Sequence, residues 1–372
     1  MIKKENGFKH NFSNATGRWA GVGPYYAMFP LTFAFDVVDK YTSQGESVLD
    51  PFAGRGSSVY AAAVRERSGI AIEINPVGWI YGRAKLDTSS KQWVNRRLNK
   101  VKKHAPDYKH EADELPEFFD YCYTPQIQRF LLAARSELNW RRNKSDATLM
   151  AIILVYLHGK RDRALSNQMR QAKAMSPDYS VRWWKERDMK PPQKNPYNFM
   201  EKRIEWRYKN GRPPSQNSRM LLGNSENIMK EVQKGVENGK INSFSLLFTS
   251  PPYYGVTNYY YDQWLRLWML GYPPYPKSPG EKYKRKFESK DNYEKLLHHV
   301  FNRSARAMSE NSIVYVRTDA REYTFKTTRE VLNSCFPEKD EKIKERPVSG
   351  DTQTSLYGNE SQKPGEIDIV MT

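Results

Sequence analysis

Short apolar runs alternate with helix-like stretches near the start of the chain. Residues 46–50 form a compact, mostly apolar run that predicts a buried strand, and the alanine-rich residues 59–64 predict a helix. A glycine-containing turn separates the two. Residues 69–74 predict a second strand that carries an acid near its end. Strand, turn, helix and strand in this order are typical of an open parallel sheet of the dinucleotide-binding kind.

The alternation stops between residues 91 and 219 and then resumes. The expected later elements are strands at 220–224, 243–247 and 312–316 and helices at 226–235, 261–270, 292–308 and 327–336. Residues 343–348 and 366–371 predict two final strands that the polar loop 349–365 joins into an antiparallel hairpin. The pattern therefore predicts an α/β, Rossmann-like fold of about seven strands, mostly parallel, with an antiparallel C-terminal hairpin.

Positive charge is concentrated in the middle of the chain. The whole sequence holds 60 Lys and Arg against 42 Asp and Glu, a net charge of +18, and residues 91–219 alone hold 28 basic and 14 acidic residues. Such a segment favours contact with a polyanion, most plausibly nucleic acid, although a basic surface that only aids solubility is the alternative. We expect residues 1–90 and 219–372 to form the catalytic α/β domain, and residues 91–218 to form an inserted, basic, mainly helical module.

Composition also predicts where the protein works. Cys122 and Cys335 are too few for a disulfide framework and cannot by themselves form a zinc site. The first residues lack the apolar stretch of a signal peptide. The apolar run 147–157 is too short to cross a bilayer and predicts a buried helix. We therefore expect a reduced, soluble, cytoplasmic protein, without a metal and without contact to a membrane.

The glycine turn and the acid after it predict a nucleoside site. Gly54 and Gly56 allow the backbone to approach a ligand closely, and the helix after them directs free amides toward that ligand. The third glycine of a dinucleotide site and the Lys-Ser/Thr pair of a P-loop are both missing. Glu73 is either a ligand for ribose hydroxyls or a solvated acid at a strand end. A nucleoside without a pyrophosphate fits S-adenosylmethionine.

The fourth expected strand, at 243–247, is soon followed by two prolines. Pro251 and Pro252 lack an N–H group and cannot continue a sheet ladder, so the chain must leave the sheet in a stiff turn. That turn holds Ser250 and Tyr253 at the carboxyl end of the strand, where open α/β sheets bind their ligands.

Two segments resemble the motifs of a known family. Asp-Pro-Phe-Ala-Gly-Arg-Gly-Ser at 50–57 and Thr-Ser-Pro-Pro-Tyr at 249–253 resemble those of the amino-methylating DNA methyltransferases, which modify N4 of cytosine or N6 of adenine. The resemblance implies a Rossmann-like methyltransferase fold, with S-adenosylmethionine at the first motif and catalysis at the second. It covers residues 24–85 and 219–320 well and the basic segment poorly.

The resemblance assigns roles to individual residues. Phe29 and Pro30 fall where such enzymes have a segment that covers the cofactor, and Asn224 stands where relatives often have Asp. The implied cofactor-binding residues are Phe29, Pro30, Asp50, Pro51, Phe52, Gly54, Gly56, Ser57, Glu73, Asn224 and Ser225. The implied catalytic residues are Ser250, Pro251, Pro252 and Tyr253.

The first residue of the second motif bears on the substrate. Ser250 resembles cytosine-N4 enzymes more than adenine-N6 enzymes, where Asp is usual. The Ser250 hydroxyl and the Pro251 carbonyl would accept hydrogen bonds from the target amine, and Tyr253 would stack on a base flipped out of duplex DNA. The resemblance would also be compatible with a prokaryotic source and with association with a restriction endonuclease, a partner that the sequence itself does not reveal. Adenine-N6 methylation, RNA or protein-amide methylation, and a catalytically silent DNA-binding subunit remain alternatives.

We expect residues 91–218 to be the target-recognition module, with a solvated helical cap as the alternative, and their basic residues are the candidates for DNA contact. Arg and Lys bind phosphates, and Arg can also read guanine. The candidates are Arg141, Arg142, Lys160, Arg161, Arg163, Arg182, Lys185 and Arg207. The tryptophans among them, Trp183 and Trp184, are expected to pack in a core, as are Trp264, Leu267 and Trp268 at helical spacing.

Overall fold

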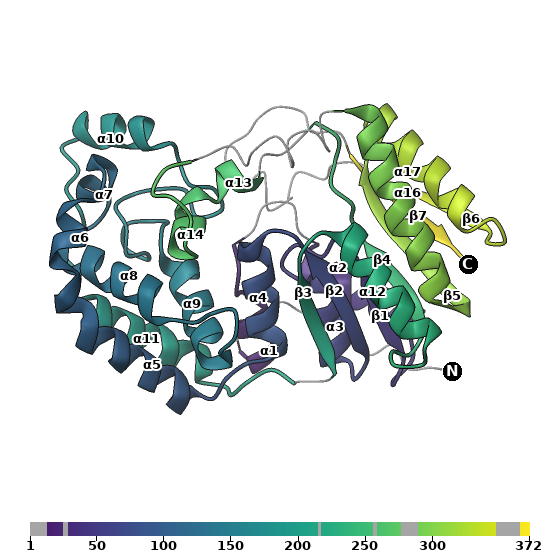
Figure 1. Ribbon diagram of the computed structural model, residues 1–372, viewed down its shortest axis with the longest axis horizontal. Helices are drawn as coiled ribbons and strands as arrows, with labels where there is room; N and C mark the ends of the chain where they lie inside the picture. The colour runs from purple at the N-terminus through teal and green to yellow at the C-terminus, as the bar shows by residue number, and fades with distance from the viewer. Residues whose placement is uncertain (1–12, 25–28, 215–216, 256–258, 277–288, 347–364) are drawn as a thin grey trace.

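A sheet flanked by helices and a separate group of helices lie side by side in the computed structural model (Figure 1). The structure describes residues 13–24, 29–214, 217–255, 259–276, 289–346 and 365–372. Almost all of the expected loop 349–365 lies outside these residues.

The sheet has seven strands in the order β3-β2-β1-β4-β5-β7-β6. They are β1 Ser47–Asp50, β2 Ser68–Glu73, β3 Ser218–Leu222, β4 Phe244–Thr249, β5 Met308–Asp319, β6 Glu341–Arg346 and β7 Glu366–Met371. The pairs among β1 to β5 are parallel, and β7 is antiparallel to both β5 and β6. This confirms the predicted Rossmann-like fold with its antiparallel C-terminal pair.

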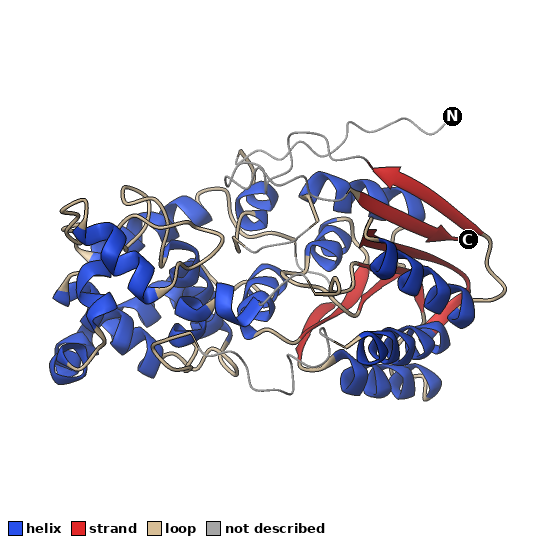
Figure 2. Ribbon diagram, turned by 90° about the horizontal axis from the view of Figure 1, so that it is seen from above, coloured by secondary structure: helices blue, strands red, loops and turns tan. Residues whose placement is uncertain are grey.

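Helices cover both faces of the sheet (Figures 1 and 2). One face carries α2 Leu31–Tyr41 and α3 Ser57–Val64, with α4 Pro76–Leu86 and the short α1 Ala15–Ala20 beside them. The other carries α12 Ser225–Glu237, α16 Lys290–Ala307 and α17 Glu322–Cys335. Successive strand residues point to opposite faces, so Val48 joins one hydrophobic core and Leu49 the other. Both strands of the first predicted unit are therefore buried on both sides.

The basic segment folds into helices, as expected. They are α5 Lys91–His104, the 3-10 helix Ala105–Tyr108, α6 Lys109–Asp113, α7 Glu117–Cys122, α8 Pro125–Glu137, α9 Lys144–Tyr156, α10 Pro177–Lys185 and α11 Pro196–Tyr208. The apolar run predicted as a buried helix is α9, in which every residue from Asp146 to Val155 is buried. Its packing joins the same hydrophobic core as α3 and α4, so the helical group and the sheet share apolar contacts.

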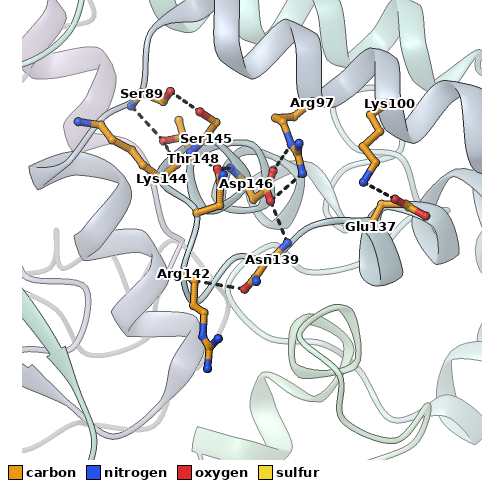
Figure 3. A network of polar contacts seen from close by, with 11 residues as sticks. Ser89, Arg97, Lys100, Glu137, Asn139, Arg142, Lys144, Ser145, Asp146 and Thr148 are labelled. Carbon is orange, nitrogen blue, oxygen red and sulfur yellow. Dashed lines mark hydrogen bonds and ion pairs between the residues drawn. The ribbon is translucent and has the colours of Figure 1, made fainter.

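Polar contacts fix the start of this helical group (Figure 3). Asp146 on α9 is 1% exposed and accepts hydrogen bonds from the Arg97 guanidinium and from the Asn139 backbone, the latter at 3.0 Å. The hydroxyl of Ser89, just before α5, forms a 2.8 Å hydrogen bond with the hydroxyl of Ser145. These bonds hold the segment that leaves the sheet domain against the central helix of the group.

The helix expected at 261–270 is broken in two. It forms α13 Tyr259–Asp262 and α14 Trp264–Met269, which extend from the end of β4 into the helical group. The Trp264 ring lies 4.9 Å from that of Phe118, and buried Arg266 donates a 3.1 Å hydrogen bond to the Leu154 carbonyl. Core positions for Trp264, Leu267, Trp268 and Trp184 are confirmed, and Trp183 is half-buried against the same core.

Within the described part of the chain, none of the helices combines the length and the apolar character that crossing a membrane requires.

Candidate cofactor and catalytic site

The carboxyl ends of β1, β2, β3 and β4 lie at one edge of the sheet. The chain runs outward from β1 to β2 and β3 on one side, while β4 pairs with β1 on the other. This reversal of strand order is the place where open α/β sheets bind ligands. Both sequence motifs therefore begin at the position that the fold itself marks as a binding site.

The turn after β1 opens toward this edge. Gly54 and Gly56 have φ angles of 54° and 70°, in the left-handed region that favours glycine. Gly56 is the N-cap of α3, so the unpaired amides of the first turn of that helix face the same region. The Ser57 hydroxyl is buried and has no hydrogen-bond partner among the described residues. An unsatisfied buried hydroxyl beside free amides is a suitable contact for a polar ligand.

Asp50 ends β1 and is almost fully buried. One carboxylate oxygen accepts a 2.6 Å hydrogen bond from the Thr249 hydroxyl of β4, and the other accepts one from the Ser58 hydroxyl of α3. Burial raises the pKa of Asp50 to about 6, against the opposing effect of these hydrogen bonds. Both carboxylate oxygens of Asp50, an implied cofactor-binding residue, thus accept hydrogen bonds from protein groups. The bond to Thr249 links the first motif to the second.

Glu73 ends β2 and is 9% exposed. Its Oε1 accepts a 2.7 Å hydrogen bond from the Asn75 amide. Burial raises the pKa of Glu73 to about 8, although hydrogen bonds from the Asn75 and Gly54 amides act in the opposite direction. Asn75 was missed from the sequence: its side-chain oxygen caps α4, and its buried Nδ2 has no partner among the described residues. Its position two residues after the acid and just before Pro76 is the signal that could have identified it.

Asn224 and Ser225 follow β3 and border the turn. The Asn224 side chain caps α12 by accepting a 2.9 Å hydrogen bond from the Glu226 amide. The Ser225 hydroxyl donates a 2.6 Å hydrogen bond to the carbonyl of Pro51. Both side chains therefore have structural partners, and Ser225 fixes the glycine turn from the side of β3.

The Ser-Pro-Pro-Tyr loop begins where β4 ends. Pro251 is buried, while Ser250 and Tyr253 are half-buried and their hydroxyl oxygens lie 3.5 Å apart. The next residue, Tyr254, packs its ring edge-on against Tyr293 of α16 and Tyr323 of α17, at centroid distances of 5.7 and 4.9 Å. One tyrosine thus anchors the loop to the helices, and its neighbour stays close to the serine.

The remaining predicted cofactor residues surround the same edge. The Phe29 ring stacks on Phe248 of β4 at 4.6 Å, and exposed Pro30 is the N-cap of α2. The Phe52 amide donates to Asp50 at 3.2 Å, and its partly exposed ring lies 6.1 Å from that of Phe301. Phe29 and Phe52 therefore approach the ends of β4 and β1 from opposite faces of the sheet.

Seven of the eight basic candidates are exposed. Arg141, Arg142, Lys160, Arg161, Arg163, Arg182 and Lys185 lie at the surface of the helical group. The guanidinium of Arg142 points away from the buried network around Asp146 (Figure 3). Lys185 already pairs with Glu117 at 2.6 Å.

Arg207 requires a correction. It is 2% exposed, and its guanidinium donates to the Arg18 carbonyl and, at 3.5 Å, to the Tyr156 hydroxyl. A side chain enclosed in this way cannot reach a phosphate, so Arg207 serves the packing of α11 against α1.

Comparisons with known proteins add little. No protein-family model and no curated protein matches the chain. Among solved structures, it is similar to SMU.776, assigned as a methyltransferase and solved with SAH, at a TM-score of 0.35 and 9% identity over 92% of this chain and 49% of that one. A SAM-dependent methyltransferase assigned in Streptococcus mutans gives a TM-score of 0.35 and 9% identity over 93% and 50% of the two chains.

The rRNA methyltransferase aviRa from Streptomyces viridochromogenes gives a TM-score of 0.36 and 10% identity over 97% of this chain and 96% of that one. The present chain spans about half the length of the first two structures. Likeness at this level establishes no shared activity.

Proposed function

We propose that this protein is an S-adenosylmethionine-dependent methyltransferase that methylates the exocyclic N4 amine of cytosine in duplex DNA. The contact between Asp50 and Thr249 carries the proposal. It joins a glycine turn of nucleoside-binding character to a Ser-Pro-Pro-Tyr loop at the switch point of the sheet, so that one ligand can reach both.

The residues at the turn fit such a cofactor. The Glu73 carboxyl would accept hydrogen bonds from the ribose hydroxyls, and the amides at the start of α3 would bind the carboxylate of the methionine part. The Ser57 hydroxyl and the side-chain Nδ2 of Asn75 are buried without a hydrogen-bond partner among the described residues, and both could bind polar atoms of the cofactor. When bound, S-adenosylmethionine supplies a methyl group on a sulfonium, whose neutral thioether is an excellent leaving group.

The loop after β4 would prepare the target amine. An exocyclic amine is a poor nucleophile because its lone pair is delocalised into the ring. The Ser250 hydroxyl and the Pro251 carbonyl would accept its hydrogens, which favours a pyramidal nitrogen with a lone pair free to attack. Two prolines hold these acceptors in place, and fixed geometry is the main contribution of such a site. The Tyr253 ring would stack on the flipped base.

Exposed basic residues support nucleic acid as the substrate class. They lie on the helical group, and α14, which follows the Ser-Pro-Pro-Tyr loop in the chain, packs against α7 and α8 of that group. Arginine and lysine there would neutralise DNA phosphates on either side of a flipped base. Cytosine is preferred over adenine because of Ser250, and a partner restriction endonuclease is part of the same proposal.

Nucleoside analysis tests the proposal. The purified protein is incubated with labelled S-adenosylmethionine and either duplex DNA or RNA, and the digested product is identified by mass spectrometry. We expect N4-methylcytosine from DNA, and we expect Ser250→Ala to lose the label while its cofactor dissociation constant stays within about threefold of wild type. N6-methyladenine or labelled RNA would reassign the substrate. Intact cofactor and DNA binding without any transfer would identify a silent DNA-binding subunit.

A further inference from the structure

The ends of β1 and β4 are joined by side chains where their backbone pairing stops. The parallel register between these strands covers Val48 with Leu246 and Leu49 with Leu247. Beyond it, the buried Thr249 hydroxyl donates to Asp50 at 2.6 Å. The Asp50–Thr249 hydrogen bond thus links the two strands at the point where each strand ends and its functional loop begins.

The same carboxylate also binds the glycine turn (residues 51–56), called the cofactor turn below, and the first turn of α3 that follows it. It accepts hydrogen bonds from the Ser58 hydroxyl in the first turn of α3 and, at 3.2 Å, from the Phe52 amide within the glycine turn. Thr249 and Ser58 are fully buried and Asp50 is 1% exposed. Water therefore cannot replace a lost partner without opening the core.

We propose that Asp50 and Thr249 are positioning residues, which fix the distance and orientation between the cofactor turn and the Ser250–Tyr253 loop. This inference rests on the proposed function. It differs from the role implied by resemblance, in which Asp50 contacts the cofactor itself. Because Ser250 directly follows Thr249, a small rotation at Thr249 moves the acceptor hydroxyl relative to the turn that holds the cofactor.

The effect of breaking the tie follows from the geometry. Thr249→Val keeps the shape of the side chain and removes the donor, so the carboxylate stays buried with one partner fewer. Misplacement of a reacting group by about 1 Å reduces the rate about a hundredfold. The Asp50 carboxylate keeps its hydrogen bonds from Ser58 and Phe52, so the cofactor turn keeps its shape and we expect cofactor binding to be preserved.

Three variants test the inference. Thr249→Val should lower kcat about 10- to 100-fold, while the dissociation constant of S-adenosylhomocysteine, measured by calorimetry, changes less than about threefold. Thr249→Ser restores the donor and should recover most of the rate. Thr328→Val is the matched control, because Thr328 is equally buried on α17 and donates its hydroxyl to the Thr324 carbonyl at 2.7 Å.

A second readout does not depend on activity. Backbone amides of Ser250 and Tyr253 should exchange hydrogen faster in ligand-free Thr249→Val than in wild type, with no such change in Thr328→Val. Wild-type kcat and unchanged exchange in Thr249→Val would overturn the inference, as would an equal loss of kcat in Thr328→Val. Absence of methyl transfer in the wild type would defeat the proposed function instead, and the exchange measurement would still decide whether the tie holds the loop.

Discussion

Cofactor affinity should increase as the pH rises through 8, because the group expected to bind the ribose is neutral in the ligand-free protein near pH 7. Burial raises the pKa of Glu73 to about 8. The ionised fraction of such a carboxyl is about 0.1 at pH 7 and about 0.9 at pH 9. Ribose hydroxyls donate to a carboxylate more strongly than to a neutral acid.

The size of the effect follows from these fractions. If only the ionised form binds the ribose, the association constant should rise about tenfold from pH 7 to pH 9, or about 1.4 kcal/mol. Glu73→Gln has the same shape and no titrating proton, so its affinity should be independent of pH over this range. At pH 9 it should bind more weakly than wild type, and the difference between the two proteins should shrink as the pH falls toward 7.

Calorimetry with adenosine measures this directly. Adenosine carries the ribose hydroxyls but lacks the α-amino group of S-adenosylmethionine, and α-amino groups titrate near pH 8 themselves. Any change in affinity with pH then comes from the protein. An association constant that stays level or falls between pH 7 and pH 9 in the wild type would refute the role of Glu73.

Three further results are expected. The ligand-free protein should lose stability as the pH rises from about 5 to about 8. Asp50 and Glu73 have higher pKa values in the folded than in the unfolded state, so the folded state binds more protons in this window. Thermal denaturation at pH 6 and pH 8 measures the difference. Asp368→Ala should cost about 3 kcal/mol in urea denaturation, because the buried guanidinium of Arg317 loses the carboxylate that binds it at 2.6 and 3.0 Å and keeps the half-exposed Glu366 as its ion-pair partner. Arg182→Gln should weaken binding to any duplex and reduce the salt dependence by about one phosphate contact, as measured by fluorescence anisotropy in a salt series.

Matched variants separate these effects from general damage. Glu73→Gln should remove most of the pH dependence of stability, and an unchanged slope would contradict the assignment. Glu341→Gln breaks the more exposed ion pair with Arg329 and should cost less than about 1 kcal/mol, so an equal loss in both acidic variants would argue against the buried pair at Arg317. Arg207→Met should lower stability and leave the salt dependence as in wild type.

The local sequence pattern was sufficient to predict most strands of the sheet. The runs at 46–50 and 69–74 are apolar because β1 and β2 are covered on both faces, and burial on both faces leaves a clear mark on a sequence. The turn at Gly54 and Gly56 was equally legible, because only glycine adopts its backbone angles without strain.

Long-range contacts account for what the sequence did not reveal. The helix expected at 261–270 breaks after Asp262 because its second half packs among Phe118, Phe119 and the buried Arg266 contacts, all of which lie far away in sequence. Strand β5 begins at Met308, earlier than expected, because Met308 pairs with Phe244 of β4 before a shift in register carries the pairing on to Ile313 and Leu246. Neither result is encoded in the local periodicity.

The site shows the same division. The Ser-Pro-Pro-Tyr loop was predictable because proline forbids a continued strand. The bond between Asp50 and Thr249 was not, since it joins residues 199 positions apart. Charge patterns also cannot distinguish Arg207, which is enclosed, from Arg182, which is exposed, because both stand beside tryptophan in basic stretches of the sequence.

A crystal structure of the protein with S-adenosylhomocysteine tests the central claim most directly. The account predicts that the ribose hydroxyls lie against Glu73, that the amino-acid part follows the turn from Gly54 to Ser57, and that the sulfur faces Ser250. Binding of the ligand at another edge of the sheet, or a sulfur turned away from the Ser250–Tyr253 loop, would contradict it.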